Sequence, residues 1–266
     1  MRLPDFLILG PPRCGTTWLA QALRSHSEVF MPRRKELYFF DKGYADGLER
    51  YASHFEGAGT AHVVGEATSS YFYAPQAAER IREHLPDVKM IAILRDPVDR
   101  LVSRYLNIQS AHYDTNRHLD LWDKIEAKPE IVFEGLYYTH LSRYFRLFDP
   151  SQLLVLMFSR IRDEPQALLA DVCRFLGVSE DHAPSTVNSK VNSALPKPHI
   201  GKSTLVYYLA IAARRLKLQS WSEKMMNGNA SDVAVLSEDE RQRVYDLYFR
   251  QEIEKLHAEL GITVSA

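Results

Sequence analysis

The residues with the clearest potential for chemistry lie in the loop from Gly10 to Thr17, which reads Gly-Pro-Pro-Arg-Cys-Gly-Thr-Thr. Its two glycines, Gly10 and Gly15, have the separation of the phosphate-binding pattern G-x-x-x-x-G-K-[ST], in which backbone N–H groups and a helix N-terminus hold an anion. Thr16 stands where that pattern has lysine, and the loop's own cation is Arg13. The loop therefore predicts a site for one phosphate group rather than for a magnesium-bound diphosphate. A tight strand-to-helix turn without a ligand is the alternative.

Glu36 is the second candidate, because its neighbours would keep a carboxylate ionised. It follows the cationic triplet Arg33-Arg34-Lys35 and precedes the aromatic run Leu37-Tyr38-Phe39-Phe40. We expect this composition in the wall of a pocket, where a carboxylate held ionised by nearby cations acts as a general base. The alternative is a solvated glutamate that only offsets the charge of its basic neighbours.

Arg95 and Ser103 form the third candidate site. Arg95 directly follows the apolar run Lys89–Leu94, and open α/β sheets bind ligands at the carboxyl ends of their strands. Ser103 comes eight residues later, which is roughly two helical turns along a predicted helix. An arginine fork and a neutral hydroxyl suit a second, separate phosphate group. The alternative is a surface ion pair of Arg95 with Asp96 or Asp99.

Alternating strands and helices must position these residues. Short continuous apolar runs predict buried parallel strands at 6–9, 62–66, 89–94 and 152–158, with an edge strand or loop within 25–32. Helical spacing of apolar residues, together with proline and capping signals, predicts helices at 16–23, 48–55, 76–85, 98–106, 134–148, 165–176 and 237–260. The expected fold is α/β, with a P-loop-type central parallel sheet flanked by helices and a C-terminal helical extension.

Composition and charge exclude several classes of protein. With 45% hydrophobic residues, 25% charged residues and a net charge of −1, the chain is globular and lacks the basic field that favours nucleic acid. Cys14 and Cys173 are its two cysteines, so neither a disulfide framework nor a zinc or other metal site is predicted. No leader or membrane-spanning run is evident, and the expected location is cytoplasmic.

Together, the three motifs resemble those of the sulfotransferases that use 3′-phosphoadenosine 5′-phosphosulfate (PAPS), particularly the branch of heparan sulfate sulfotransferases and many bacterial enzymes. The similar segments are Gly10–Thr17, Lys35–Asp41, and Leu94–Pro97 with Ser103, in the family's order and spacing. This resemblance implies that PAPS is the donor and that no metal takes part.

The resemblance also implies roles for individual residues. Arg13 would bind the 5′-phosphosulfate and stabilise the leaving oxygen, and Glu36 would take the acceptor's proton. Arg95 and Ser103 would hold the 3′-phosphate. Further contacts are implied to the nucleotide for Cys14, Gly15, Thr16, Thr17, Trp18 and Lys190, and to the acceptor for Tyr38 and His112.

Two departures from the family pattern fall on the acceptor side. Ala67 stands where relatives that act on heparan sulfate carry a catalytic lysine, and Tyr38 stands where they carry a histidine. Either Arg13 alone covers the missing charge, or Lys35 or another residue supplies it. The expected reaction is in-line transfer of sulfonate to a hydroxyl of a small-molecule, glycan or lipid-like acceptor that does not resemble heparan.

One domain is expected over residues 1–266, with residues from about 200 to 266 as the helical extension on the acceptor side. Within it, the apolar and basic stretch 205–218 either covers the acceptor site or lies on a membrane, and membrane contact is not expected. Two other functions stay open. One is a P-loop kinase of a small metabolite, against which the missing loop lysine counts. The other is a non-catalytic nucleotide-binding module, which would leave Glu36 without a purpose.

Overall fold

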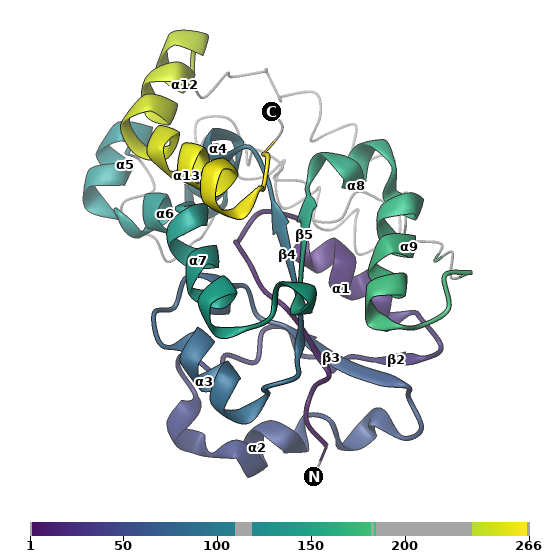
Figure 1. Cartoon of the computed structure of the whole chain (residues 1–266). Coiled ribbons are helices and arrows are strands. Elements are labelled where there is room, and N and C mark those ends of the chain that lie inside the picture. The colour runs from purple at the N-terminus through teal and green to yellow at the C-terminus, as the bar shows by residue number, and fades with distance from the viewer. Residues whose placement is uncertain (1, 110–118, 182–183, 185–235, 265–266) are drawn as a thin grey trace, which may run out of the picture.

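The computed structural model describes residues 2–109, 119–181, 184 and 236–264. Its centre is a sheet of parallel strands in the order β2-β3-β1-β4-β5 (Figure 1). The strands are β1 (Phe6–Ile8), β2 (Val29–Phe30), β3 (Val63–Ala67), β4 (Lys89–Leu94) and β5 (Leu153–Met157). This parallel sheet and its flanking helices confirm the expected α/β fold, and β2 is the expected edge strand.

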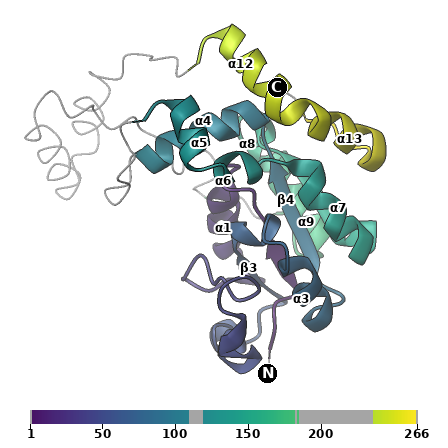
Figure 2. The same ribbon diagram turned by 90° about the vertical axis from the view of Figure 1, so that its left-hand side faces the viewer.

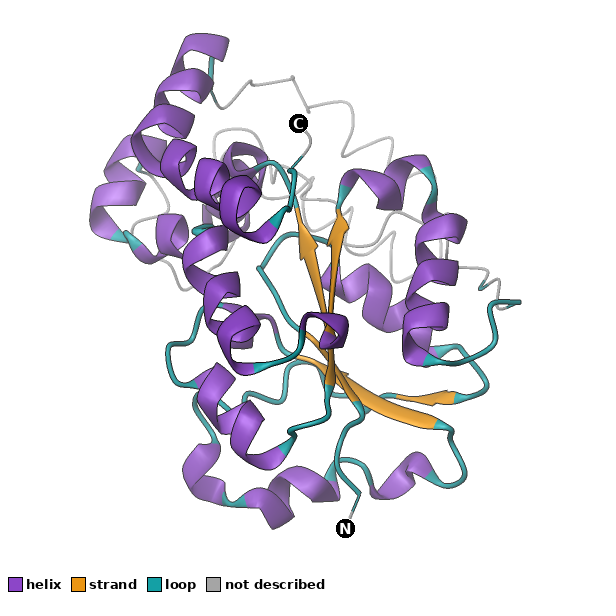
Figure 3. Cartoon of the chain, viewed as in Figure 1, coloured by secondary structure: helices purple, strands orange, loops and turns teal. Residues whose placement is uncertain are grey.

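Helices cover both faces of the sheet, and the side chains of β1 alternate between two hydrophobic cores (Figures 1 and 3). Phe6 and Ile8 pack in one core, and Leu7 and Leu9 pack in the other. The strand reads as a continuous apolar run because both of its faces are buried. The first face carries α1 (Thr16–Arg24), α8 (Ser159–Asp163) and α9 (Pro165–Leu176), and the second carries α2 (Leu48–Ser53), α3 (Ala77–His84) and α7 (Tyr137–Leu147).

A third core joins the C-terminal helices to the region after β4. It is built from α4 (Pro97–Gln109), α5 (Leu121–Ala127), α6 (Glu130–Phe133) and α12 (Glu238–Val244). A π-helical segment, Tyr245–Phe249, leads into α13 (Arg250–Leu260), which lies against α7. Figure 2 shows α12 and α13 crossing the end of the molecule at which α4 lies. The predicted cap at Ser237 is confirmed by its capping box with Glu240.

Two sequence-based expectations are corrected. The helix predicted from residue 134 begins at Tyr137, after the separate short helix α6. The aromatic run after Glu36 is core rather than pocket wall, because Phe39 and Phe40 are 5% and 0% exposed while Tyr38 is partly exposed. The stretch 205–218 lies outside the described residues, and the single domain stays a prediction. No helix in the described ranges is long and apolar enough to span a membrane.

Because the strands are parallel, their carboxyl ends lie at one edge of the sheet. The candidate residues lie in the segments that follow the strands at this edge. Arg13 follows β1 and Glu36 follows β2. Ser69 follows β3, Arg95 follows β4, and Phe158 follows β5. Residues far apart in the sequence therefore meet at the edge where α/β proteins bind ligands.

Candidate active site

The loop after β1 leaves the start of α1 open to an anion. Gly15 is the N-cap of α1 with φ 87°, a left-handed conformation that favours glycine. No side chain caps the helix, and its first turn carries no acidic residue. A Cβ on Gly10 would lie 2.3 Å from the carbonyl oxygen of Ser69, so the loop can pass that close only without a side chain there. Uncapped N–H groups and the helix dipole together favour a negatively charged group at this point.

Arg13 extends from this loop to α4. Its Nε donates to Ser103 Oγ at 3.1 Å. In the part of the chain that the structure describes, no carboxylate lies within ion-pair distance of Arg13. Burial lowers the pKa of Arg13, and the positive charges of Arg104 and Arg95 lower it further, although an arginine stays protonated. A guanidinium that faces other cations rather than a carboxylate is suited to bind an anion.

Arg95 directly follows β4 and lies close enough to Arg13 for their charges to interact. Its Nη2 lies 3.4 Å from Asp99, and its guanidinium carbon lies 4.7 Å from the centre of the Phe158 ring. The Asp99 pair agrees with one of the alternatives drawn from the sequence. The Nε of Arg95, however, is buried and has no hydrogen-bond partner among the described residues. Because an unsatisfied buried donor is costly, this N–H is suited to donate to an anion bound beside it.

Cys14 and Trp18 turn their side chains into the protein. Cys14 is fully buried, and its Sγ lies 4.0 Å from the hydroxyl of Tyr137, which donates to the carbonyl of Arg95 at 2.9 Å. Burial raises the pKa of the Cys14 thiol to about 11, so it is not a nucleophile at neutral pH. Trp18 is 5% exposed and packs in the core beside α1. The burial of both side chains favours contacts to the nucleotide through the backbone groups of these two residues.

Glu36 lies in the loop after β2 with a side chain that is 16% exposed. The hydroxyl of Ser69 donates to its Oε1, and Lys35 Nζ lies 3.3 Å from the same oxygen. Burial raises the pKa of Glu36, but the hydrogen bond from Ser69, the charge of Lys35 and a hydrogen bond from Tyr38 outweigh it, and the net pKa is lowered. The carboxylate is therefore ionised at neutral pH and able to accept a proton.

Lys35 connects the carboxylate to the anion-binding loop. Its Nζ lies 3.5 Å from Thr16 Oγ1, at the first residue of α1, as well as 3.3 Å from Glu36. Ala67 ends β3 as a buried residue and supplies no charge. Of the alternatives left open by the sequence, this geometry favours Lys35 as the additional cation.

Backbone strain marks both loops of the candidate site. Of the described residues other than glycine, Arg13 and Tyr38 are the two with a positive φ, 74° and 61°. Such conformations are disfavoured for residues with a side chain and gather at functional sites. Burial and the charge of Glu36 raise the pKa of Tyr38 to about 12, so its hydroxyl stays protonated beside the carboxylate. Lys42 Nζ lies 4.6 Å from the centre of its ring.

Sequence reasoning identified the loops but missed two of their partners. Ser69 was not among the candidate residues, although its position just beyond the carboxyl end of β3 is typical of ligand-binding residues in parallel sheets. Arg104 donates to the buried carboxylate of Glu134 through Nε at 2.9 Å and Nη2 at 2.8 Å, and no sequence pattern announced this pair. His112 and Lys190 lie outside the described residues.

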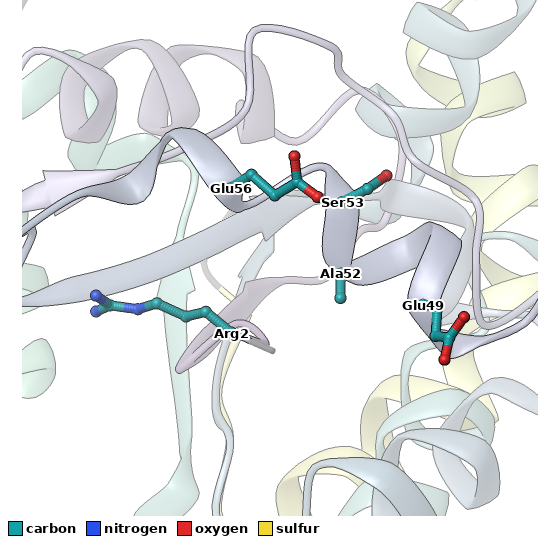
Figure 4. Close-up of a pocket in the computed structure, with 5 residues that line it drawn as sticks. All are labelled: Arg2, Glu49, Ala52, Ser53 and Glu56. Atoms are coloured by element: carbon teal, nitrogen blue, oxygen red, sulfur yellow. The ribbon is translucent and has the colours of Figure 1, made fainter.

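A separate surface pocket of about 270 Å³ lies beside α2 (Figure 4). The side chains that line it are Arg2, Glu49, Ala52, Ser53 and Glu56. None of them belongs to the candidate site, and Arg2 already donates to the carbonyl of Ala61 at 2.7 Å. This pocket carries no functional assignment.

Comparison with protein families finds that residues 3–202 match the sulfotransferase domain. The mouse bifunctional heparan sulfate N-deacetylase/N-sulfotransferase 3 is 31% identical over 197 residues, covering 67% of this chain and 23% of that protein. The human heparan sulfate glucosamine 3-O-sulfotransferase 3B1 is 31% identical over 183 residues, covering 66% of this chain and 47% of that protein. The chain thus spans between about a quarter and about a half of the length of these curated relatives.

Two solved sulfotransferases resemble this chain in structure. A sulfotransferase from Alicyclobacillus acidocaldarius is 27% identical, with a TM-score of 0.64 and coverage of 82% of this chain and 96% of that one. A mouse sulfotransferase solved in complex with PAP is 17% identical, with a TM-score of 0.51 and coverage of 96% of this chain and 86% of that one. At that identity, the second match speaks for the fold alone.

Proposed function

Because the chain belongs to the sulfotransferase family, we propose that it transfers the sulfonate group of PAPS to a hydroxyl of a small-molecule, glycan or lipid-like acceptor. One observation carries the proposal. An anion site without a carboxylate, formed by Arg13 and the uncapped start of α1, is joined through Lys35 to the ionised carboxylate of Glu36. PAPS supplies an activated sulfonate group, and this chain supplies positioning and charge.

The 5′ end of the donor fits the loop after β1. The N–H groups at Gly15 and Thr16, the hydroxyl of Thr17 and the guanidinium of Arg13 offer donors to one phosphate group. Arg13 also reaches Ser103 on α4, so one side chain lies between the loop and the second predicted phosphate site. The absence of an acid from the first turn of α1 supports an anionic occupant.

The 3′-phosphate is assigned to Arg95 and Ser103, supported by the unpartnered Nε of Arg95. Arg95→Ala is expected to weaken binding of adenosine 3′,5′-bisphosphate by roughly 10- to 100-fold, because a hydrogen bond to a charged group contributes about 1.5–3 kcal/mol. Binding of adenosine 5′-phosphate, which lacks the 3′ group, should change far less. Isothermal titration of both nucleotides measures this, and equal weakening of the two would count against a 3′-phosphate site.

Glu36 is proposed as the general base. The acceptor hydroxyl gives its proton to the carboxylate of Glu36 while its oxygen forms the new bond to sulfur. The bond from sulfur to the 5′-phosphate oxygen breaks, and its electron pair stays on that oxygen. Arg13 and the first N–H groups of α1 stabilise the negative charge that grows there.

Lys35 is proposed to act on the sulfonate group during transfer. Its ammonium lies between Thr16, at the donor's loop, and Glu36, at the acceptor's base. A cation in this place neutralises charge on the group that moves from one side to the other. This assignment explains how the chain can work with alanine at position 67.

The direct test is to incubate the purified protein with PAPS and three acceptor mixtures, of small alcohols and phenols, of glycans and of hydroxylated lipids. Mass spectrometry should detect a sulfonated product in one mixture, together with adenosine 3′,5′-bisphosphate in equal amount. Glu36→Gln is the matched blank. Phosphorylated rather than sulfonated products, formed when ATP and magnesium replace PAPS, would contradict the proposal.

A further inference from the structure

A buried carboxyl group that the proposed reaction does not use lies directly behind the Glu36 loop. Glu66, on β3, is 2% exposed. The hydroxyl of Tyr51 donates to its Oε1 at 3.0 Å, and the hydroxyl of Thr68 donates to its Oε2 at 2.6 Å. Tyr71 adds a third side-chain hydrogen bond to the same carboxyl group. Glu66 thus gathers hydroxyls from three separate positions in the chain.

Two of these hydroxyls also hold the backbone that follows Glu36. Thr68 Oγ1 accepts from the amide N of Leu37 at 3.0 Å and from that of Tyr38 at 3.5 Å. The hydroxyl of Tyr71 accepts from the amide N of Phe39 at 2.8 Å and from that of Phe40 at 3.3 Å. Four consecutive backbone amides therefore donate to two hydroxyls. Both of these hydroxyls in turn donate to the carboxyl group of Glu66.

The direction of these hydrogen bonds depends on Glu66 as an acceptor. A hydroxyl has one hydrogen, and a hydroxyl that donates it to a carboxylate keeps its lone pairs for backbone amides. If Glu66 carried no acceptor, the hydrogens of Thr68 and Tyr71 would turn elsewhere and compete with the amides. The amides after Glu36 would then lose partners in a buried place, which is costly.

We propose that Glu66 is a positioning residue, which sets the hydroxyls of Thr68 and Tyr71 so that they hold the loop carrying Glu36 in its working geometry. This rests on the proposed function, since it assigns Glu36 a reaction to be positioned for. The proposed relay runs from the buried carboxyl group of Glu66 through two hydroxyls to four backbone amides. These amides directly follow Glu36, the proposed general base.

The energetics support a functional reason for this carboxyl group. Burial raises the pKa of Glu66 to about 7, against the three hydrogen bonds and together with the nearby charge of Glu36. An acid with a higher pKa in the folded chain destabilises the fold once it ionises. This loss of folding free energy is absent when the pH is below 4.5, the ordinary pKa of a glutamate, and it is complete when the pH is above about 7. A core position that needed only packing would be more stable with an apolar residue.

The test compares variants that break the relay with one that leaves it intact. Glu66→Gln replaces one of the two acceptor oxygens with an NH₂ group, which donates and competes with the hydroxyls. Thr68→Val removes the intermediate hydroxyl, whereas Thr68→Ser keeps it. Tyr51→Phe is the matched control, because Tyr51 is equally buried and donates to the same carboxyl group but accepts from no described amide of the loop. Its ring, which stacks on Phe39 with centroids 4.4 Å apart, is kept.

Glu66→Gln and Thr68→Val are expected to lower kcat by up to about 10²-fold, the order of loss that follows a misplaced catalytic group. The KM for PAPS should stay within about twofold, because the donor's loop is untouched. Thr68→Ser and Tyr51→Phe should keep most of the activity. A loss of kcat in Tyr51→Phe equal to that in Thr68→Val would overturn the proposal.

Hydrogen exchange of the peptide over residues 36–41 gives a second readout that needs no turnover. Exchange should speed up in Glu66→Gln and Thr68→Val but not in Tyr51→Phe. Unchanged exchange in both relay variants would sink the proposal even if the enzyme is a sulfotransferase. Should the unmodified protein prove inactive with PAPS, the exchange result alone decides whether the relay exists. A Glu66→Gln chain that fails to fold leaves Thr68→Val against Thr68→Ser as the deciding pair.

Discussion

Glu36→Gln is expected to lower kcat by ~10²–10⁴-fold, the range that general base catalysis contributes. Glutamine has nearly the same shape and can still accept from Ser69, but it cannot take a proton from an acceptor hydroxyl. Binding of adenosine 3′,5′-bisphosphate should be unchanged, because the proposed role of Glu36 is toward the acceptor and not toward the nucleotide. Steady-state kinetics and titration with the bisphosphate measure the two effects on one preparation.

Asp41→Asn is the matched control for Glu36→Gln. Asp41 lies in the same loop, and its carboxylate accepts from Ser70 at 2.5 Å, whereas the ion pair of Lys35 is with Glu36. The Asp41→Asn variant removes one negative charge from the loop that carries Glu36, and it should retain most of the activity. If Glu36→Gln kept more than about a tenth of the kcat, or if both variants lost the same fraction, Glu36 would not be the base.

Lys35→Ala is expected to lower kcat by about 10²–10³-fold, the loss seen when one donor to a developing charge is removed. The effect is expected because Lys35 Nζ lies 3.5 Å from Thr16 Oγ1 and 3.3 Å from Glu36 Oε1. The neighbouring Arg34 is exposed and serves as the control cation, so Arg34→Ala should be close to the unmodified enzyme. Initial rates with saturating PAPS and acceptor check both variants.

A pH profile separates two roles for Lys35. Its charge helps to lower the pKa of Glu36, so Lys35→Ala moves that pKa upward and leaves less of the base ionised at low pH. If raising the pH restored full kcat, Lys35 would serve only to keep Glu36 ionised. A loss that persists at every pH where Glu36 is ionised is the result expected for a cation acting on the sulfonate group.

Local patterns were sufficient to predict the elements that carry the site. Phe6–Ile8 and Lys89–Leu94 are buried on both faces of a parallel sheet, and such strands read as plain apolar runs. Gly15 and the hydroxyls after it mark the start of α1 through spacing alone. The edge of the sheet on which the candidate residues meet then follows from the parallel order of the strands.

Contacts between distant segments were beyond the sequence. The hydrogen bond from Arg13 to Ser103 depends on the position of α4 relative to the loop after β1, and no local sequence pattern predicts that position. Phe40 looked like a pocket residue because aromatic side chains suit both pockets and cores, and here it is fully buried. In the sequence, Glu66 is only the last residue of a predicted strand. Its partner Tyr51 lies in α2, and no local pattern predicts that this helix packs against β3.

The central claim is that two anion sites, at Arg13 and at Arg95, bind the two ends of one adenine nucleotide without magnesium. Thermal unfolding with adenosine 3′,5′-bisphosphate, compared with ATP and magnesium, tests it most directly. At about 100 times its Kd, the bisphosphate should stabilise the fold by about 2.7 kcal/mol and raise Tm by roughly 5–10 °C, with little effect from ATP and magnesium. Stabilisation by ATP and magnesium with none by the bisphosphate would contradict the claim.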